Sequence, residues 1–308
     1  MTTSPGGPSG PIYSTLAGQT PTGQAAVDLL LEVLDLEKLD DNVFRGVSPP
    51  VGPQRVYGGQ VAGQALVAAG RTVDPSRTVH SLHGYFVRGG DPAEPITYSV
   101  ENIRDGRSFS VRRAVAEQHG KVIFFMSASF QRAEKGLDHQ IETPLEVPPP
   151  EEVPTMNERL ARYPERLGVW GLIPRPMDVR YVGEPGWVPP GDRPVEARQR
   201  VWMRIDGKLP DDPLIHACAL TFASDMTLLD AVLSTHGEVW GPGGYIGASL
   251  DHALWFHRPF RADEWFLYDC SSPSASGARG LANGRMYTAD GALIASAVQE
   301  GLLRRIGA

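Results

Sequence analysis

Residues 57–70 read YGGQVAGQALVAAG, a stretch of small and apolar residues that contains four glycines. The second half of this stretch has helical character, and small side chains let a helix lie close against a sheet. A glycine inside a helix costs about 1 kcal/mol relative to alanine, so close packing must compensate for it. The G-x-G-x-x-G and Gly-Lys-Ser/Thr patterns of phosphate-binding loops are missing here. The stretch therefore predicts a packed central helix and argues against a nucleotide site.

Strand-like segments surround this helix. A short one at 42–47 precedes it, after an apolar helix expected at 25–39, and four longer ones follow at 78–87, 95–103, 107–117 and 121–131. The dipeptides DG at 105–106 and HG at 119–120 separate the last three, as tight hairpin turns would. The first half thus predicts a strand, a helix and four antiparallel strands.

The same order returns in the second half of the chain. A strand is expected at 200–205, helices at 211–222 and 224–233, and strands at 245–257, 264–271, 278–288 and 292–303. The first of these helices opens with DDP, an acidic cap followed by an early proline. NG at 283–284 falls inside a strand and is a candidate bulge. Local echoes about 170 residues apart, such as HSLH at 80–83 and ASLD at 248–251, indicate a duplicated domain.

Composition sets the boundaries between these units. Residues 1–24 are rich in Gly, Pro, Ser and Thr, so we expect a disordered tail. Residues 136–195 hold 12 of the 27 prolines, and we expect an ordered connector without regular sheet there. The first repeat then spans 25–135 and the second 196–308.

Charge and cysteine content exclude several classes of protein. A formal charge of −7 gives no global basic field for nucleic acid. Two cysteines exclude a disulfide scaffold and a cysteine-built zinc site. No apolar run is long enough to span a bilayer, and residues 1–37 lack Lys and Arg, so no secretory signal is indicated. We expect a cytoplasmic protein that binds neither nucleic acid nor membrane.

Conventional catalytic motifs are missing. His80 and His83 lie three apart in a strand and point to opposite faces, so they do not form a metal pair. No Gly-x-Ser-x-Gly pentapeptide occurs, which disfavours a serine hydrolase of the α/β type. Three polar residues in apolar surroundings remain as candidates: Asp225, Ser249 and Gln299.

Each candidate has a structural and a functional interpretation. Asp225 could cap the start of a helix, where the macrodipole favours an acid, or it could orient or deprotonate a water. Gln299 could be a satisfied core amide or could bind that water. Ser249 could simply bond to nearby backbone.

Four segments carry a resemblance to a known family: RVYGGQVAGQA (55–65), DGRSFS (105–110), DHALWFHRPF (251–260) and ASAVQEG (295–301). In this order they resemble the type II acyl-CoA thioesterase (TesB-like) family, over about residues 27–304. The resemblance implies an α+β double hotdog fold, in which two tandem repeats each wrap an antiparallel sheet around a long central helix. It agrees with the duplication inferred above.

The resemblance also implies a function and a site. It identifies the chain as an acyl-CoA thioesterase that hydrolyses acyl-CoA to free CoA and a carboxylic acid. Asp225 matches the catalytic aspartate, Ser249 a position held by Thr or Ser, and Gln299 the catalytic glutamine. Asp225 would activate a water that Ser249 and Gln299 hold, with no cofactor. Acyl-CoA is the expected substrate, and we expect a homo-oligomer, a dimer or tetramer of double hotdogs.

Two alternatives remain open on the same fold. One is a non-catalytic module that binds or senses acyl-CoA, against which the presence of all three polar residues argues. The other is a hotdog hydratase, but the Asp and His pair with Asn-Pro spacing that this chemistry uses is not found.

The missing ligand clusters and phosphate loops predict an activity that needs neither metal nor nucleotide. Hydrolysis of an acyl-CoA should keep its rate after dialysis against EDTA, measured as release of free thiol. A persistent loss of turnover that a single metal restores would contradict this prediction.

Overall fold

A computed structural model describes residues 20–49, 55–143, 146–163, 175–188, 191, 197–241 and 243–307. The expected tail at 1–24 therefore lies outside the described residues up to position 19. The helices are α1 (Gly23–Leu34), α2 (Gly58–Gly70), α3 (Met156–Leu160), α4 (Pro213–Ser224) and α5 (Asp230–His236), with a 3-10 turn at Pro150–Glu152. The strands are β1 (Glu37–Asp40), β2 (Val43–Gly46), β3 (Arg77–Phe86), β4 (Ile96–Asp105), β5 (Phe109–Gln118), β6 (Lys121–Arg132), β7 (Met177–Tyr181), β8 (Arg198–Ile205), β9 (Tyr245–Ser249), β10 (Asp251–Phe256), β11 (Phe266–Ser276), β12 (Arg279–Thr288) and β13 (Leu293–Arg305).

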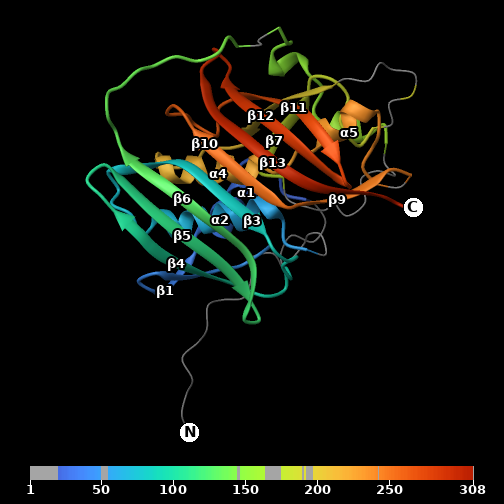
Figure 1. Ribbon diagram of the computed structural model, residues 1–308. Helices are drawn as coiled ribbons and strands as arrows, with labels where there is room; N and C mark the ends of the chain where they lie inside the picture. The colour runs from blue at the N-terminus through green and yellow to red at the C-terminus, as the bar shows by residue number, and fades with distance from the viewer. Residues whose placement is uncertain are drawn as a thin grey trace.

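The strands form one sheet whose two halves mirror each other. The order is β1-β2-β4-β5-β6-β3-β10-β13-β12-β11-β8-β7, with β9 beside β13. Every pairing between these strands is antiparallel. The halves meet where β3 pairs with β10, with Leu82 opposite Leu254 (Figure 1). This is the predicted double hotdog, two repeats joined edge to edge.

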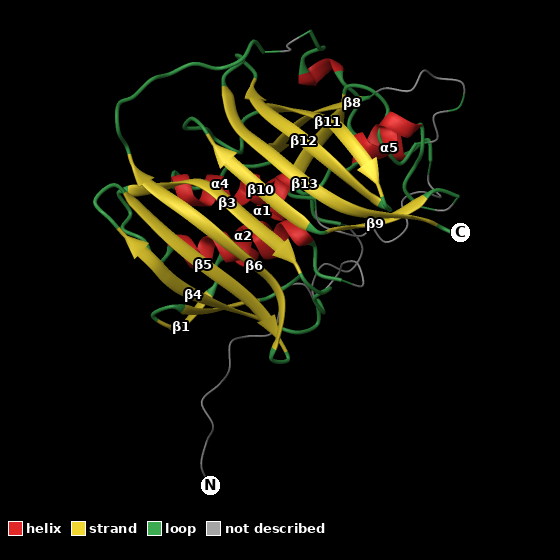
Figure 2. Ribbon diagram, in the orientation of Figure 1, coloured by secondary structure: helices red, strands yellow, loops and turns green. Residues whose placement is uncertain are grey.

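The central helices α2 and α4 lie together against one face of the sheet (Figure 2). Their glycines make the close approach possible. A Cβ on Gly59 would lie 2.3 Å from the Phe222 carbonyl oxygen, and one on Gly63 would lie 3.2 Å from the Cys218 carbonyl oxygen. A side chain at either position would push the two helix backbones apart. The glycines of the opening stretch are therefore required by the contact between the two helices.

Several predicted elements differ in their bounds. The helix expected at 25–39 ends at Leu34, and the following residues form the edge strand β1. The strand expected at 245–257 divides at Leu250 into β9, which pairs with β13 alone, and β10, which also joins β3. NG at 283–284 is not a bulge, because both residues pair in regular register with β13; the neighbouring irregularity has its extra residue on β11, between Ser271 and Ser274.

The connector contains a strand that the sequence did not predict. Regular sheet was not expected between 136 and 195, yet β7 forms there and pairs with β8. The prediction was wrong because proline excludes only central strands, whereas an edge strand needs hydrogen bonds on one side. Pro176 precedes β7 and Pro185 follows it, so the strand fits between the prolines. No helix of the described residues is long and apolar enough to span a membrane.

A buried carboxyl holds the connector to the second repeat. Asp230, in α5, accepts hydrogen bonds from the Tyr181 hydroxyl at 2.8 Å and from Trp240 Nε1 at 2.6 Å. Burial raises the pKa of Asp230 from 3.8 to about 6, although both donors act in the opposite direction. Ionisation of this group therefore destabilises the folded protein.

Replacing Gly59 by alanine should destabilise the protein by about 1–3 kcal/mol, as other overpacked core sites do, because the new methyl group meets backbone that cannot rotate away. Urea unfolding measures the effect. Gly136→Ala is a matched control, since a Cβ there meets nothing within 4 Å. Equal unfolding midpoints for the two variants would show that the helices do not approach as described.

The raised pKa of Asp230 predicts a pH-dependent stability. The protonated carboxyl contributes fully below pH 3.8, and its contribution is lost as pH rises to about 6. That shift corresponds to roughly 3 kcal/mol. Relative to Asp230→Asn, whose side chain does not titrate, the wild-type protein should lose about this much free energy of unfolding between pH 4 and pH 7. A difference that stays constant across this range would contradict a buried, raised carboxyl.

Candidate active site

Asp225 lies at the end of a helix and not at the start of one. It is the residue that directly follows α4, and the next helix, α5, begins only at Asp230. The interpretation of Asp225 as a cap at the start of a helix is therefore wrong, because it is the C-cap residue of α4. A carboxylate at this end meets the negative pole of the α4 dipole, so other groups must stabilise it.

Two of these groups are the other sequence candidates. Ser249 ends β9, and its hydroxyl donates to Asp225 Oδ1 at 2.9 Å. Gln299, in β13, donates through Nε2 to the same oxygen at 2.6 Å. The structure thus brings all three predicted residues together, from one helix end and two neighbouring strands. Both partners act as donors, so they fix the orientation of the carboxylate.

The first turn of α2 also lies against Asp225. A Cβ built on Gly58 would lie 2.7 Å from Asp225 Oδ2, so this oxygen rests against the beginning of the helix. The first N–H groups of a helix have no partner within it and carry its positive pole. Tyr57, the N-cap residue, does not cap them with its side chain. Asp225 Oδ2 thus lies against the end of α2 that has no side-chain cap.

Two tyrosines, the partly buried Tyr57 and the buried Tyr268, hold the end of α4 in place. The Tyr57 hydroxyl donates to the Phe222 carbonyl at 2.8 Å, and the Tyr268 hydroxyl donates to the Ser224 carbonyl at 3.1 Å. These carbonyls belong to the last turn of α4, where carbonyl groups have no N–H partner within the helix. Burial is the main cause that raises the pKa of both phenols, and the nearby Asp225 adds to it, so they stay protonated donors. Gly284 leaves room for the Tyr268 ring, since a Cβ there would lie 2.3 Å from it.

The sequence prediction missed these tyrosines and also His252. The buried His252 ring bonds through Nε2 to the Ser224 hydroxyl at 2.7 Å. Ser224 also reaches the Thr221 carbonyl at 2.9 Å. In the sequence, a tyrosine or histidine next to the site cannot be distinguished from one that only packs in the core. Its role becomes visible only from its position in the structure. Within the described ranges, no three His, Cys, Asp or Glu side chains are grouped as metal ligands.

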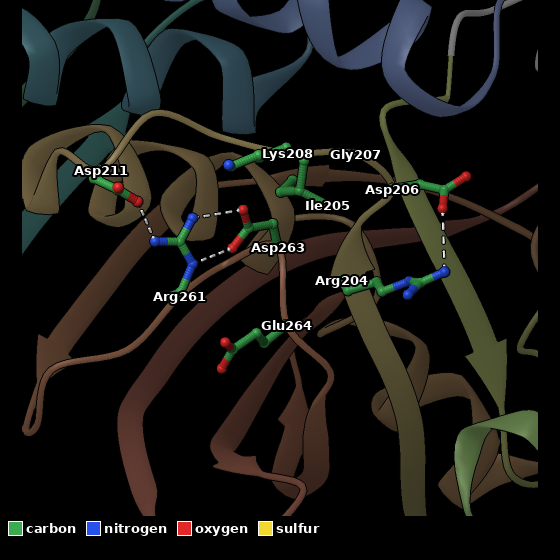
Figure 3. Close-up of a pocket in the computed structure, with 9 residues that line it drawn as sticks. All are labelled: Arg204, Ile205, Asp206, Gly207, Lys208, Asp211, Arg261, Asp263 and Glu264. Atoms are coloured by element: carbon green, nitrogen blue, oxygen red, sulfur yellow. Dashed lines mark hydrogen bonds and ion pairs between the residues drawn. The ribbon is translucent and has the colours of Figure 1, made fainter.

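A cavity of about 590 Å³ lies at the opposite end of α4. Figure 3 shows Arg261 in this cavity, paired with Asp211 and Asp263, and Arg204 paired with Asp206. Its charges are thus largely paired with each other. Asp211 precedes α4 and Asp225 follows it, so about 18 Å of helix separates this cavity from the three candidates. It forms no part of their site.

The fold is a double hotdog, and a carboxylate, a hydroxyl and an amide meet at the junction of its repeats. Comparison with known proteins identifies the family of the chain. The model of the acyl-CoA thioesterase family matches residues 184–302, and that of the acyl-CoA thioesterase N-terminal domain matches residues 45–131. The chain belongs to the acyl-CoA thioesterase family.

Individual relatives agree over most of the chain. It is 42% identical to human acyl-coenzyme A thioesterase 8, covering 92% of this chain and 91% of the relative. It is 40% identical to acyl-CoA thioesterase 2 of Haemophilus influenzae, covering 89% and 96%. The crystal structure of acyl-CoA thioesterase II TesB2 from Mycobacterium marinum superposes with a TM-score of 0.73 at 46% identity, covering 90% of this chain and 99% of the other.

Proposed function

We propose that this thioesterase hydrolyses acyl-CoA by attack of a water that Asp225 activates, with Ser249 and Gln299 as its partners. The observation that carries the proposal is the shared contact of both partners with Asp225 Oδ1. Because that oxygen already accepts two hydrogen bonds, Oδ2 is the oxygen that remains to take a proton.

The reaction then needs no covalent intermediate. Water attacks the thioester carbonyl carbon while its proton passes to Asp225 Oδ2. The negative charge that develops on the carbonyl oxygen is stabilised by N–H groups of the first turn of α2, which lie beside Oδ2. Collapse of this intermediate breaks the carbon–sulfur bond. The proton held by Asp225 goes to the leaving CoA sulfur, and the carboxylic acid and CoA are released.

Other properties stay predictions. The homo-oligomer, a dimer or tetramer, and the cytoplasmic location are expectations from the sequence and the family likeness. An apolar tunnel for the acyl chain between the helices and the connector is likewise expected. A panel of acyl-CoA substrates from short to long chains, with CoA release as the signal, would define the preferred length. A chain that binds acyl-CoA without releasing CoA would support the sensing module instead.

Asp225→Asn tests the base directly. Asparagine keeps an acceptor for Ser249 and Gln299 but cannot take a proton. The kcat should fall by about 10²–10⁴, with little change in KM. A melting curve serves as the control for folding, and full activity in a folded variant would remove Asp225 from catalysis.

Ser249 should act through its hydroxyl alone. Ser249→Thr keeps that hydroxyl and should retain kcat within a few fold. Ser249→Ala removes a hydrogen bond to a charged acceptor, a loss of about 1.5–3 kcal/mol and so roughly 10–100-fold in kcat. Combining Ser249→Ala with Gln299→Ala should cost less than the sum of the single effects, because both donors hold one oxygen. An acylated Ser249 detected by mass spectrometry would replace the water mechanism with a nucleophilic one.

A further inference from the structure

Because the chain contains two similar repeats, the strands around the candidate site in the second repeat can be compared with the matching strands of the first repeat, which carry no such site. The end of β3 at Phe86 and the end of β10 at Phe256 lie 170 residues apart, as do the ends of β5 and β12 at Gln118 and Thr288. Leu82 is therefore the counterpart of His252.

The matching positions of β6 and β13 lie 171 residues apart. Ala116 pairs with Phe124 in the first repeat, and its counterpart Met286 pairs with Ala295 in the second. Ala128 is thus the counterpart of Gln299.

This comparison reveals a polar pair. In the first repeat Leu82 and Ala128 lie directly opposite each other on β3 and β6, both buried. In the second repeat His252 precedes Ala253, and Gln299 follows Val298, the residue that Ala253 faces across the strands. His252 is 1% exposed and Gln299 is fully buried. An apolar pair has therefore been replaced by a histidine and an amide where the site stands.

Both side chains carry a buried atom that lacks a partner. Among the described residues, neither His252 Nδ1 nor Gln299 Oε1 has a hydrogen bond, although His252 Nε2 and Gln299 Nε2 each have one. A buried polar atom without a partner destabilises the folded protein. One hydrogen bond from Nδ1–H to Oε1 would satisfy both atoms.

We propose that His252 is a positioning residue whose Nδ1–H donates to Gln299 Oε1 and so aims the Gln299 amide at Asp225. This rests on the proposed function of the Asp225 site. A glutamine amide can turn over, which would present Oε1 to the Asp225 carboxylate and repel it. A donor on Oε1 fixes the productive orientation. The Ser224 hydroxyl lies 2.9 Å from the Thr221 carbonyl and 2.7 Å from His252 Nε2. In this arrangement its single proton points to Nε2 and not to the carbonyl, which completes a chain from Ser224 through His252 and Gln299 to Asp225.

The imidazole must be neutral for this role, and its surroundings agree. Burial lowers the pKa of His252, while the Asp225 and Asp251 carboxylates and the Gln299 side chain act in the opposite direction. A neutral ring carries one N–H, so a proton on Nδ1 leaves Nε2 to accept from Ser224.

The tautomer is measured on the wild-type protein by nitrogen NMR with ¹⁵N-labelled histidine, the His252 signals being assigned by their loss in a variant. Protonation at Nδ1 is the expected result. Protonation at Nε2 would overturn the proposal. This outcome does not depend on whether Asp225 is the catalytic base.

Kinetics test the coupling to Gln299. His252→Leu introduces the residue that the first repeat already packs at this place, so it should fold. Its kcat should fall by about 10-fold with KM within twofold, and His252→Asn, whose amide can replace Nδ1–H, should recover most of that loss. In a Gln299→Ala background, His252→Leu should change kcat by less than twofold. His80→Leu, on the matching strand of the first repeat, is the control and should leave kcat unchanged.

Two kinetic outcomes would contradict the proposal. One is an unchanged kcat in a folded His252→Leu variant. The other is an equal loss in the presence and absence of Gln299, which would show that His252 acts independently of the amide. Failure of Asp225→Asn to lower kcat would instead count against the proposed function, so the two results can be told apart.

Discussion

The contact between the backbones of α2 and α4 determines the site. Gly59 faces the Phe222 carbonyl with no room for a side chain, so the beginning of α2 and the end of α4 meet. Asp225, the first residue after α4, therefore lies at the first turn of α2. The carboxylate comes from the second repeat and the helix N-terminus from the first. Neither repeat could form this site alone, which gives a physical reason for fusing the two in one chain.

Function here opposes local stability. An acid at the end of α4 is unfavourable to that helix, and the hydrogen bonds from Ser249 and Gln299 offset this cost. The tyrosine hydroxyls that bind the last carbonyls of α4 keep this arrangement rigid. Rigidity suits the proposed role of Asp225, because a general base acts only within hydrogen-bond reach of its proton.

The sequence predicted what depends on short-range patterns. Hairpin dipeptides and the DDP cap located strands and α4 well, and Asp212 caps that helix as expected, accepting from the Leu214 N–H at 2.9 Å. Long-range contacts decided the rest. The local sequence does not show that the strand divides at Leu250 into β9 and β10. It also does not show that β7 lies at the edge of the sheet, where flanking prolines are tolerated. The three site candidates were found as polar residues in apolar surroundings. Whether Asp225 lies at the start or the end of a helix depends on where α4 ends. That end cannot be located from the sequence, because apolar residues lie on both sides of Asp225.

Among the described residues, the mirrored end of the helix pair lacks the groups of the proposed site. There α4 begins and α2 ends, with Gly70 against the Leu214 side chain. The residue after α2 is Arg71, which binds Asp35 and the Leu36 carbonyl, so no carboxylate stands in the place of Asp225. The first turn of α4 is already capped by Asp212, whereas that of α2 has no side-chain cap. The two repeats thus present two similar helix ends, and side-chain differences cap one of them and leave the other without a side-chain cap, where the proposed site lies.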